Sequence, residues 1–355
     1  MGLTYEHLFA LCRELAGDVT VQLSPLGDSH AVMSRYETST RDTILGLQLL
    51  TLGDRRLVLK AKAHGRTVRR RLEQVYVRFD AQLAELQHAL APSILDAIHV
   101  RELQIYQLPH ASVRALAPAS DAVWIDHDRD IYAVVMERLD GTLDDLDVWE
   151  PPAIASALAG IAPVHRELLG APPAFLVPFE QLHDARLLAY QHALLRYNAM
   201  TFPGLFDAQR TRRLDAMLAA APERRRRITS RPLTLSHGDF TPRNVCLRRD
   251  GRPCAYDWEL AQAHLPERDV VELLCYTLPP QRGWNDATCG ELLAIYRAVL
   301  GVGADELRHD LALAIEEFCT FKLLVQGITH QLLGNRRYFE RLVQNAFDAI
   351  EEYAS

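Results

Sequence analysis

The first 140 residues of the chain alternate between short apolar runs and turn residues, a pattern typical of β structure. Segments 19–29, 30–40 and 43–62 each carry this pattern. In the last of them, Gly53-Asp54 separates two runs with alternating apolar positions, which predicts a β-hairpin. Two further strands are predicted at 122–128 and 131–139, on either side of turn residues at 128–130.

Helical spacing of apolar residues interrupts this β-rich region. Residues 67–93 are predicted to form one long helix, and residues 100–109 a short helix that Pro109 stops. The helix at 67–93 would then be inserted between the strand that ends near Lys62 and the short helix.

After Leu139 the pattern is mainly helical. One helix is predicted to begin near Pro152 and to end before Gly170, and segments 180–220, 288–301 and 305–352 are also predicted to be helical. Short β segments interrupt them at 232–238 and 245–260. The chain therefore divides into a β-rich lobe, 1–138, and a helical lobe, 139–355, which together give an α+β fold.

Composition and charge exclude several classes of function. With 355 residues and 48% hydrophobic residues, the chain can fill the cores of two lobes. Its net charge of −7 argues against a nucleic-acid partner, because binding of that kind neutralises phosphates with basic residues. The arginine-rich runs at 66–71 and 223–227 are expected to be solvated faces of helices or loops.

The six cysteines are scattered without a C-x-x-C pair, which fits neither a disulfide framework nor a zinc site. The N-terminal segment reads as an amphipathic helix and not as a signal peptide, and no run of 18 apolar residues predicts a membrane span. We therefore expect a cytoplasmic protein without a membrane partner.

The strongest chemical signal is LSHGDFTPRNVCLRRDGRPCAYDWEL, residues 235–260. A short strand leads into a loop, and a hairpin turned at Asp250-Gly251 follows, so Asp239, Asn244 and Asp257 are predicted to meet at one rim. Carboxylate and amide oxygens suit Mg²⁺, whose shell substrate phosphates and waters complete. Phosphoryl transfer needs such a metal site and a further carboxylate beside the attacking hydroxyl.

The segments HGDFTPRN and AYDWE resemble the H-G-D-x-x-x-x-N and D-W-E signature of the aminoglycoside phosphotransferase and choline kinase family. That family is similar in fold to protein kinases, so the resemblance implies a two-lobed protein-kinase-like fold. It also implies that Asp239 is the catalytic aspartate, Asn244 a ligand of one Mg²⁺, and Asp257 the main metal ligand. His237 is expected to support the loop by hydrogen bonding.

Two residues near this motif have mainly structural expectations. Asp269 matches an aspartate that follows D-W-E in many members of the family, and it is either an ordinary helix N-cap or a brace of the catalytic loop. His165, in a segment that resembles the L-x-x-L-H helix of the family, is expected to pack beneath the catalytic loop.

The segment RLVLKAK supplies the expected nucleotide-binding strand. Val58 and Lys60 share one face, so Val58 can lie under the adenine while Lys60 reaches the α and β phosphates. Lys62 lies on the same face and is the alternative phosphate lysine. The resemblance of RELQIY to the R-E-x-x-x-Y helix of the family implies that Glu102 holds Lys60, with Glu73 as the alternative.

Two further nucleotide contacts follow from position in the N-terminal lobe. The segment LSPLGDSH has one glycine, Gly27, and either forms a phosphate loop in which Ser29 donates to a phosphate oxygen or is an ordinary hairpin turn. The segment VVMERLDG resembles the hinge between the lobes, where the backbone of Glu137 and Leu139 would pair with the adenine edge.

These residues predict an ATP- and Mg²⁺-dependent kinase that transfers a phosphoryl group to a hydroxyl of a small molecule. No A-P-E segment follows Asp257, which disfavours a protein kinase. Trp258, Glu259 and Glu317 are candidate substrate contacts, and acidic residues at the rim would suit an amine-bearing acceptor such as an aminoglycoside or a choline-like alcohol. A nucleoside or sugar acceptor stays open, as do the choice between ATP and GTP and the oligomeric state. The alternative is a nucleotide-binding regulatory module of the same fold.

Overall fold

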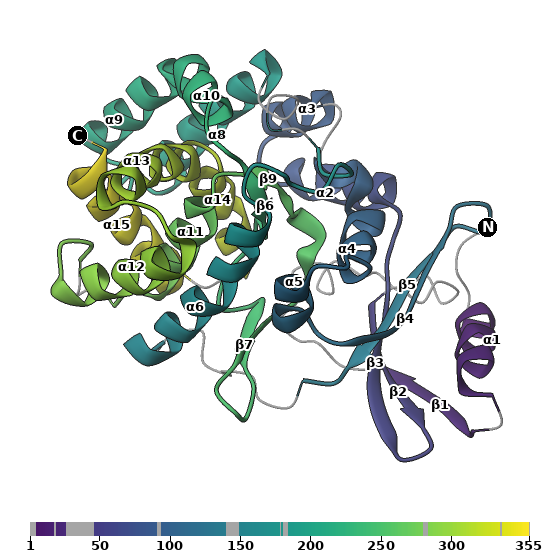
Figure 1. Cartoon of the computed structure of the whole chain (residues 1–355). Helices are drawn as coiled ribbons and strands as arrows, with labels where there is room; N and C mark the ends of the chain where they lie inside the picture. The colour runs from purple at the N-terminus through teal and green to yellow at the C-terminus, as the bar shows by residue number, and fades with distance from the viewer. Residues whose placement is uncertain are drawn as a thin grey trace.

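The computed structural model describes residues 5–17, 19–25, 46–90, 94–139, 149–177, 179, 184–279, 283–333 and 336–354. A five-stranded antiparallel sheet with the strand order β1-β2-β3-β5-β4 lies at one end of the molecule, and most of the helices lie at the other (Figure 1). The strands are β1 (Val21–Pro25), β2 (Gly46–Leu52), β3 (Arg55–Ala61), β4 (Ser120–Asp126) and β5 (Ile131–Glu137). This arrangement is the predicted α+β fold.

The two predicted hairpins of the sheet are both confirmed. Strands β2 and β3 pair from Leu52↔Arg55 onward, and Gly53 takes the positive φ of 61° that this tight turn needs. Strands β4 and β5 pair across the turn at 127–130, where Asp130 has φ 56°. Helix α1 (Tyr5–Ala16) packs Leu8 and Cys12 into a small core on one face of the sheet.

Between β3 and β4 the chain forms a helical insertion, and the expected single helix over 67–93 is wrong. The structure has α2 (Gly65–Tyr76) and α3 (Ala81–Ala89) in its place. The break occurs at Asp80, whose backbone is extended at φ −160° and whose side chain accepts a hydrogen bond from Leu83 N, so Asp80 starts a new helix. The insertion continues with η2 (Ile94–Ala97), α4 (Ile98–Tyr106) and α5 (Ala111–Leu116).

The rest of the chain is mainly helical, but two predicted helical segments contain more than one helix. The helices are α6 (Pro151–Glu167), α8 (Ala185–Thr201), α9 (Ala208–Ala219), α10 (Ala221–Thr229), α11 (Glu267–Thr277), α12 (Ala287–Leu300), α13 (Ala304–Thr320), α14 (Lys322–Leu333) and α15 (Arg336–Tyr353). The break at Phe321, with φ −126° and ψ −75°, places Lys322 at the start of α14. No helix in the described part of the chain is long and apolar enough to cross a membrane.

Short strands form the rim between the two parts. Strand β6 (Thr234–Ser236) pairs with β9 (Gln262–His264), and β7 (Val245–Leu247) pairs with β8 (Pro253–Ala255) across the predicted turn at Gly251. The single-turn helix η3 (Trp258–Leu260) follows β8 and contacts α4. Insertion helix α3 packs against α8, so the segment between β3 and β4 joins the large helical core (Figure 1).

Two expectations from composition can be compared with the structure. All six cysteines are free and buried, in keeping with the absence of a disulfide framework. The arginine run at 223–227 is not wholly solvated: Arg224, 5% exposed, donates to Met217 O and to Thr320. In the run at 66–71, Arg69 pairs with Asp96.

Candidate active site

The loop after β6 begins with a glycine that its surroundings require. Gly238 has φ +74°, and a Cβ atom at this position would lie 2.2 Å from the backbone oxygen of Leu260. The close approach holds the H-G-D segment against the segment that follows Asp257. His237 spans the same gap, because its Nε2 lies 3.0 Å from Tyr256 O.

Asp269 supports this loop and does not cap helix α11, whose N-cap is Pro266. The Asp269 carboxylate accepts hydrogen bonds from Ser236 Oγ at 2.8 Å, His237 N at 2.7 Å and Gly238 N at 3.0 Å. Its Oδ2 also lies 3.1 Å from Nε2 of buried His165. Burial alone would raise the pKa of Asp269, but the hydrogen bond and charge of His165 outweigh it and hold the pKa low. Of the two roles predicted for Asp269, the structure supports the bracing of the loop and not the helix N-cap.

The Asp239 carboxylate is held on both oxygens. Its Oδ1 accepts from Lys322 Nζ at 2.7 Å, and its Oδ2 accepts from Asn244 Nδ2 at 2.7 Å. Asn244 Nδ2 also donates to Asp239 O, so the amide oxygen of Asn244 is left for a cation. Lys322 further contacts Gly238 O at 3.1 Å and Glu272 Oε1 at 3.2 Å.

Asp257 follows β8 with a left-handed backbone, φ 64° and ψ 52°. An aspartate tolerates this conformation better than most residues, but it still costs on the order of 1 kcal/mol. Asp257 Oδ1 accepts a hydrogen bond from Lys60 Nζ at 2.6 Å, and about a third of its side chain (35%) is exposed. Burial alone would raise the pKa of Asp257, but the charges of Lys60 and Lys62 lower it to about 2.

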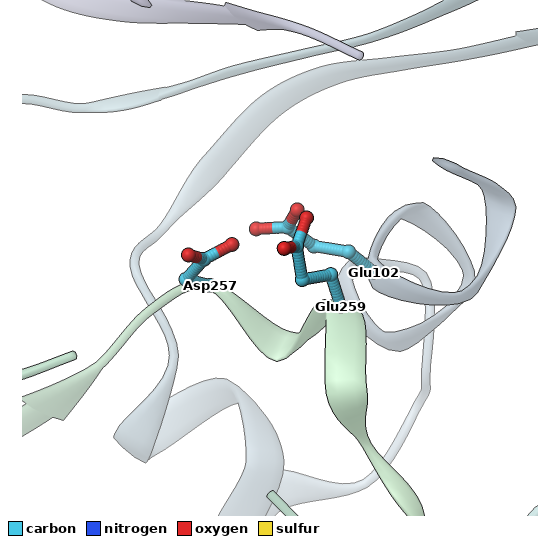
Figure 2. A group of neighbouring side chains, drawn as sticks. All are labelled: Glu102, Asp257 and Glu259. Carbon is cyan, nitrogen blue, oxygen red and sulfur yellow. The ribbon is translucent and has the colours of Figure 1, made fainter. Parts of the chain in front are cut away.

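Two lysines from the end of β3 lie among three carboxylates. Lys60 Nζ contacts Glu102 Oε1 at 2.9 Å in addition to Asp257, and Lys62 contacts Glu102 Oε2 and, at 2.8 Å, Glu259 Oε2. Figure 2 shows the three carboxylates converging from α4 and from the segment after β8. Their oxygens lie within 4.8 Å of one another, which is close enough to hold one metal ion.

In this cluster, opposite charges stabilise one another's ionised forms. Burial would lower the pKa of Lys60, yet Asp257 and Glu102 raise it well above its usual value. Burial would likewise raise the pKa of Glu102, and the two lysines lower it. Glu259 differs, because burial and the charge of Asp257 raise its pKa. The cluster therefore favours charged Lys60, Glu102 and Asp257.

Comparison with known proteins identifies the family. The phosphotransferase enzyme family, abbreviated APH, matches residues 48–309. The chain belongs to this family. No curated protein matches the phosphotransferase in a search of sequences.

Solved structures show the same fold at low sequence identity. Spectinomycin phosphotransferase in complex with ADP and spectinomycin is 14% identical, with a TM-score of 0.52 over 98% of this chain and 99% of that one. LicA in complex with AMP is 13% identical, with a TM-score of 0.51 over 99% of this chain and 98% of that one. LicA is the choline kinase of Streptococcus pneumoniae. At this identity the likeness establishes the two-lobed kinase-like fold of the phosphotransferase.

The donor set of the phosphotransferase fits Mg²⁺. Asp257 and Asn244 offer a carboxylate and an amide oxygen, the hard donors that Mg²⁺ prefers. Asn244 O accepts from Tyr256 N at 2.9 Å, so the hairpin register brings Asn244 next to the segment that carries Asp257. Only Oδ1 of Asp257 accepts a hydrogen bond from a described residue, which leaves the second oxygen to a cation.

The predicted nucleotide residues are placed as follows. Glu102 contacts both lysines, whereas Glu73 pairs with His88 at 2.8 Å on α2, away from them. Val58 is 8% exposed and packs in the large core with Met136. Predicted residues Gly27 and Ser29 lie outside the described residues.

In the predicted hinge segment, one backbone group already has a hydrogen-bond partner. Glu137 N donates to Ala119 O at 2.8 Å, so this N–H is not available to a nucleotide. The side chain of Glu137 accepts two hydrogen bonds of 2.6 Å from Arg248 on the β7–β8 hairpin and one from Ala119 N. This bidentate pair fixes the end of β5 to the hairpin of the catalytic motif. Leu139, two residues on, is partly buried.

Two of the three predicted substrate residues are buried away from solvent. Trp258 is fully buried, packs its ring 4.4 Å from that of His237 and donates to Ala255 O. Glu317 is 3% exposed and accepts from Arg268 Nε at 2.7 Å. A direct substrate contact finds no support in these placements. Glu259 contacts Lys62 in the cluster with Glu102 and Asp257.

Sequence reasoning did not assign Lys322, although a signal for it was present. Lysine and arginine together number 39, and only three of these residues are lysine: Lys60, Lys62 and Lys322. All three lie in the ion-pair clusters at Asp257 and Asp239. A compact ammonium with three donors serves such sites differently from a planar guanidinium. In a chain that otherwise uses arginine, each lysine was therefore a candidate site residue.

Proposed function

We propose that this phosphotransferase transfers the γ-phosphoryl group of ATP to a hydroxyl of a small acceptor in the presence of Mg²⁺. The observation that carries the proposal is that Lys60 joins Glu102 to Asp257, while Asn244 joins Asp239 to the segment that carries Asp257. A lysine held by a glutamate next to a metal-binding aspartate is the arrangement that orients nucleotide phosphates in kinase-like enzymes.

The nucleotide would lie between the sheet and the β7–β8 hairpin. In this arrangement Lys60 contacts the α and β phosphates, and Val58 lies under the adenine. Asn244 and Asp257 would hold Mg²⁺, which when bound neutralises charge on the β and γ oxygens. Relatives of the same fold were crystallised with ADP and AMP, which supports a nucleotide ligand.

Asp239 is the proposed base. In the transfer step the acceptor O–H bond breaks and its proton moves to a carboxylate oxygen of Asp239. The acceptor oxygen bonds to the γ phosphorus as the bond from this phosphorus to the β–γ bridging oxygen breaks, and ADP leaves with that oxygen. Lys322 and Asn244 hold the two oxygens of Asp239 in place, so the carboxylate does not have to find its orientation during the reaction.

The test uses two variants of the full chain. Asp257→Asn is expected to lower Mg²⁺-dependent turnover by several orders of magnitude, because charge neutralisation provides most of the catalysis. Asp239→Asn is expected to keep nucleotide binding and lose transfer. Product mass from a panel of hydroxylated metabolites and antibiotics and nucleotide titration measure both effects. Retention by Asp257→Asn of more than about a tenth of wild-type turnover, a loss under roughly 1.4 kcal/mol, would contradict the assignment.

A regulatory module that binds nucleotide without transfer is the second candidate. Nucleotide binding, or ADP release without any phosphorylated product, would favour it. The presence of Lys60, Glu102, Asp239, Asn244 and Asp257 together favours the enzyme.

A further inference from the structure

An arginine of the catalytic loop lies next to an aromatic surface of the helical lobe. Arg243, between Asp239 and Asn244, places its guanidinium carbon 5.7 Å from the ring centroid of Tyr338 on α15. Arg341 lies over the same ring at 5.3 Å. Both arginines are partly exposed, although the Nε atom of each is buried, whereas Tyr338 is 2% exposed and forms a buried floor. Arg341 Nη2 also donates to Tyr276 O at 3.3 Å.

This floor contains polar atoms that lack partners. The ring of His330 is tilted against that of Tyr338, with the two centroids 5.0 Å apart, and His330 is 3% exposed. Neither of its ring nitrogens has a hydrogen-bond partner in the described part of the chain. Burial, and then the charge of Arg243, lower the pKa of His330 to about 3, so its ring is neutral. Arg243 Nε is also buried without a partner, and Arg243 forms no ion pair with any described residue. Unsatisfied buried donors of this kind mark a place for a ligand.

The charge around Asp239 on this side is positive. Lys322, Arg243 and Arg341 provide three cations, and the nearby carboxylates are Asp239 and Glu272. Both carboxylates are engaged: Asp239 binds Lys322 and Asn244, and Glu272 binds Lys322 and Arg268. An additional cation brought here would be repelled.

The acidic residues that were expected to receive an amine are paired elsewhere. Glu259 contacts Lys62, and Glu317 contacts Arg268. The neighbouring Glu316 lies 3.5 Å from Arg224. An ammonium group would have to displace one of these pairs, whereas an anionic group would meet guanidinium donors directly.

We propose that the acceptor is a hydroxylated acid whose carboxylate or phosphate group binds Arg243, assisted by Arg341, while its hydroxyl meets Asp239. The inference rests on the proposed phosphoryl transfer and names its substrate class. Guanidinium groups bind carboxylate and phosphate through paired, charge-assisted hydrogen bonds, and a buried Nε–H gains the most from such a partner.

The test compares matched probes on the full chain loaded with Mg²⁺ and a non-hydrolysable ATP analogue. Gluconate and 6-phosphogluconate carry the anion, sorbitol is neutral, and glucosamine carries an amine. Titration calorimetry is expected to give the acids at least about tenfold tighter binding than sorbitol, because only the acids can form charge-assisted hydrogen bonds with the guanidinium groups. Glucosamine is expected to bind most weakly.

Variants of the two arginines test which residue causes the preference for acids over sorbitol. Arg243→Gln is expected to abolish this preference, and Arg341→Gln is expected to reduce it. Arg308→Gln is the matched control, because Arg308 also lies over a tyrosine ring, Tyr353 at 4.8 Å, but on the surface between α13 and α15. Equal binding of gluconate and sorbitol, tighter binding of glucosamine, or acid preference that survives both Arg243→Gln and Arg341→Gln would overturn the proposal.

A parallel assay with ATP and product mass separates this inference from the phosphotransferase function. Phosphorylated sorbitol or glucosamine without phosphorylated acid would remove the anionic class and leave the transfer reaction intact. Acid-selective binding without any phosphorylated product would support the anion site and count against the transfer reaction.

Discussion

Lys322 Nζ lies 2.7 Å from Asp239 Oδ1, so a lysine at the start of α14 is ion-paired with the proposed base. The N-terminus of a helix is an unfavourable place for a cation, because the helix dipole is positive there. Asp239, Glu272 and the carbonyl of Gly238 compensate for this position. The charges of Asp239 and Glu272 outweigh burial and raise the pKa of Lys322, which keeps Lys322 charged. The contact predicts a role in holding the base.

Replacement of Lys322 is expected to affect turnover more than nucleotide binding. Lys322→Met removes the charge that holds Asp239 Oδ1, and kcat is expected to fall by about a hundred- to a thousandfold, in the range seen for loss of one preorganised donor. The KM for ATP should change by less than about threefold, because the contacts of Lys322 with described residues are to Gly238, Asp239 and Glu272 and not to Lys60 or Asp257. Lys322→Arg should restore only part of kcat, since a planar guanidinium cannot reproduce three divergent contacts. An unchanged kcat in Lys322→Met, or a rise confined to the KM for ATP, would contradict this role.

The two lysines of β3 are expected to differ when each is changed to alanine. Lys60→Ala should weaken nucleotide binding, because Lys60 lies next to Asp257 at the proposed phosphate position. Lys62→Ala should mainly lower stability, by about 3–5 kcal/mol, because the side chain of Lys62 is 4% exposed and its loss leaves Glu102 and Glu259 without their shared cation. Nucleotide titration and urea unfolding of both variants measure the two effects. If Lys62→Ala weakened binding and Lys60→Ala did not, the assigned roles would have to be exchanged.

Stability is expected to depend on the protonation of Glu267. This residue is 2% exposed, and its Oε2 has no hydrogen-bond partner among the described residues. Burial, and then the charge of Asp310, raise the pKa of Glu267 from 4.5 to about 8. A carboxyl with a raised folded-state pKa contributes stability that is complete below pH 4.5 and is lost as the pH rises toward 8.

Glu267→Gln should therefore match the wild type near pH 5 and be more stable by a few kcal/mol near pH 9, measured as the free energy of unfolding in urea. Glu306→Gln is the control, because the side chain of Glu306 is 49% exposed and pairs with Arg231 nearby. A wild-type and Glu267→Gln difference that is the same at both pH values would show that Glu267 is not protonated in the folded protein.

The grouping of the proposed catalytic residues could be predicted from the sequence because the segments that carry them are local. Asp239, Asn244 and Asp257 lie on one loop and one hairpin, whose turn at Gly251 is visible in the sequence. The Lys60–Glu102 contact joins residues 42 positions apart and was reached through the family resemblance. Periodicity did not predict the break at Asp80, because an aspartate is compatible with both a helix surface and a helix start.

Other features depend on tertiary packing that no local pattern encodes. Trp258 follows a metal-binding candidate, yet its ring packs inward against His237. Lys322 becomes a neighbour of Asp239 because the helical segment breaks at Phe321. Arg243 becomes a neighbour of Tyr338 because α15 returns to the catalytic loop. From the sequence alone, the acidic residues of α13 could bind an amine, but in the fold Glu316 and Glu317 are paired with arginines.

The last prediction concerns Asp269, which accepts hydrogen bonds from Ser236 Oγ and from the backbone N–H groups of His237 and Gly238. In Asp269→Asn the amide group replaces one acceptor oxygen with a donor, so at least one buried N–H loses its partner and faces another donor. We expect a loss of about 2–4 kcal/mol in the free energy of unfolding. Turnover should fall too, because the loop that carries Asp239 is no longer fixed. Asp286→Asn is the matched control: Asp286 caps α12 through Thr288 N, and asparagine caps a helix about as well as aspartate. Urea unfolding and product mass should separate the two variants, and equal behaviour of both would mean that Asp269 acts only as an ordinary helix-end residue.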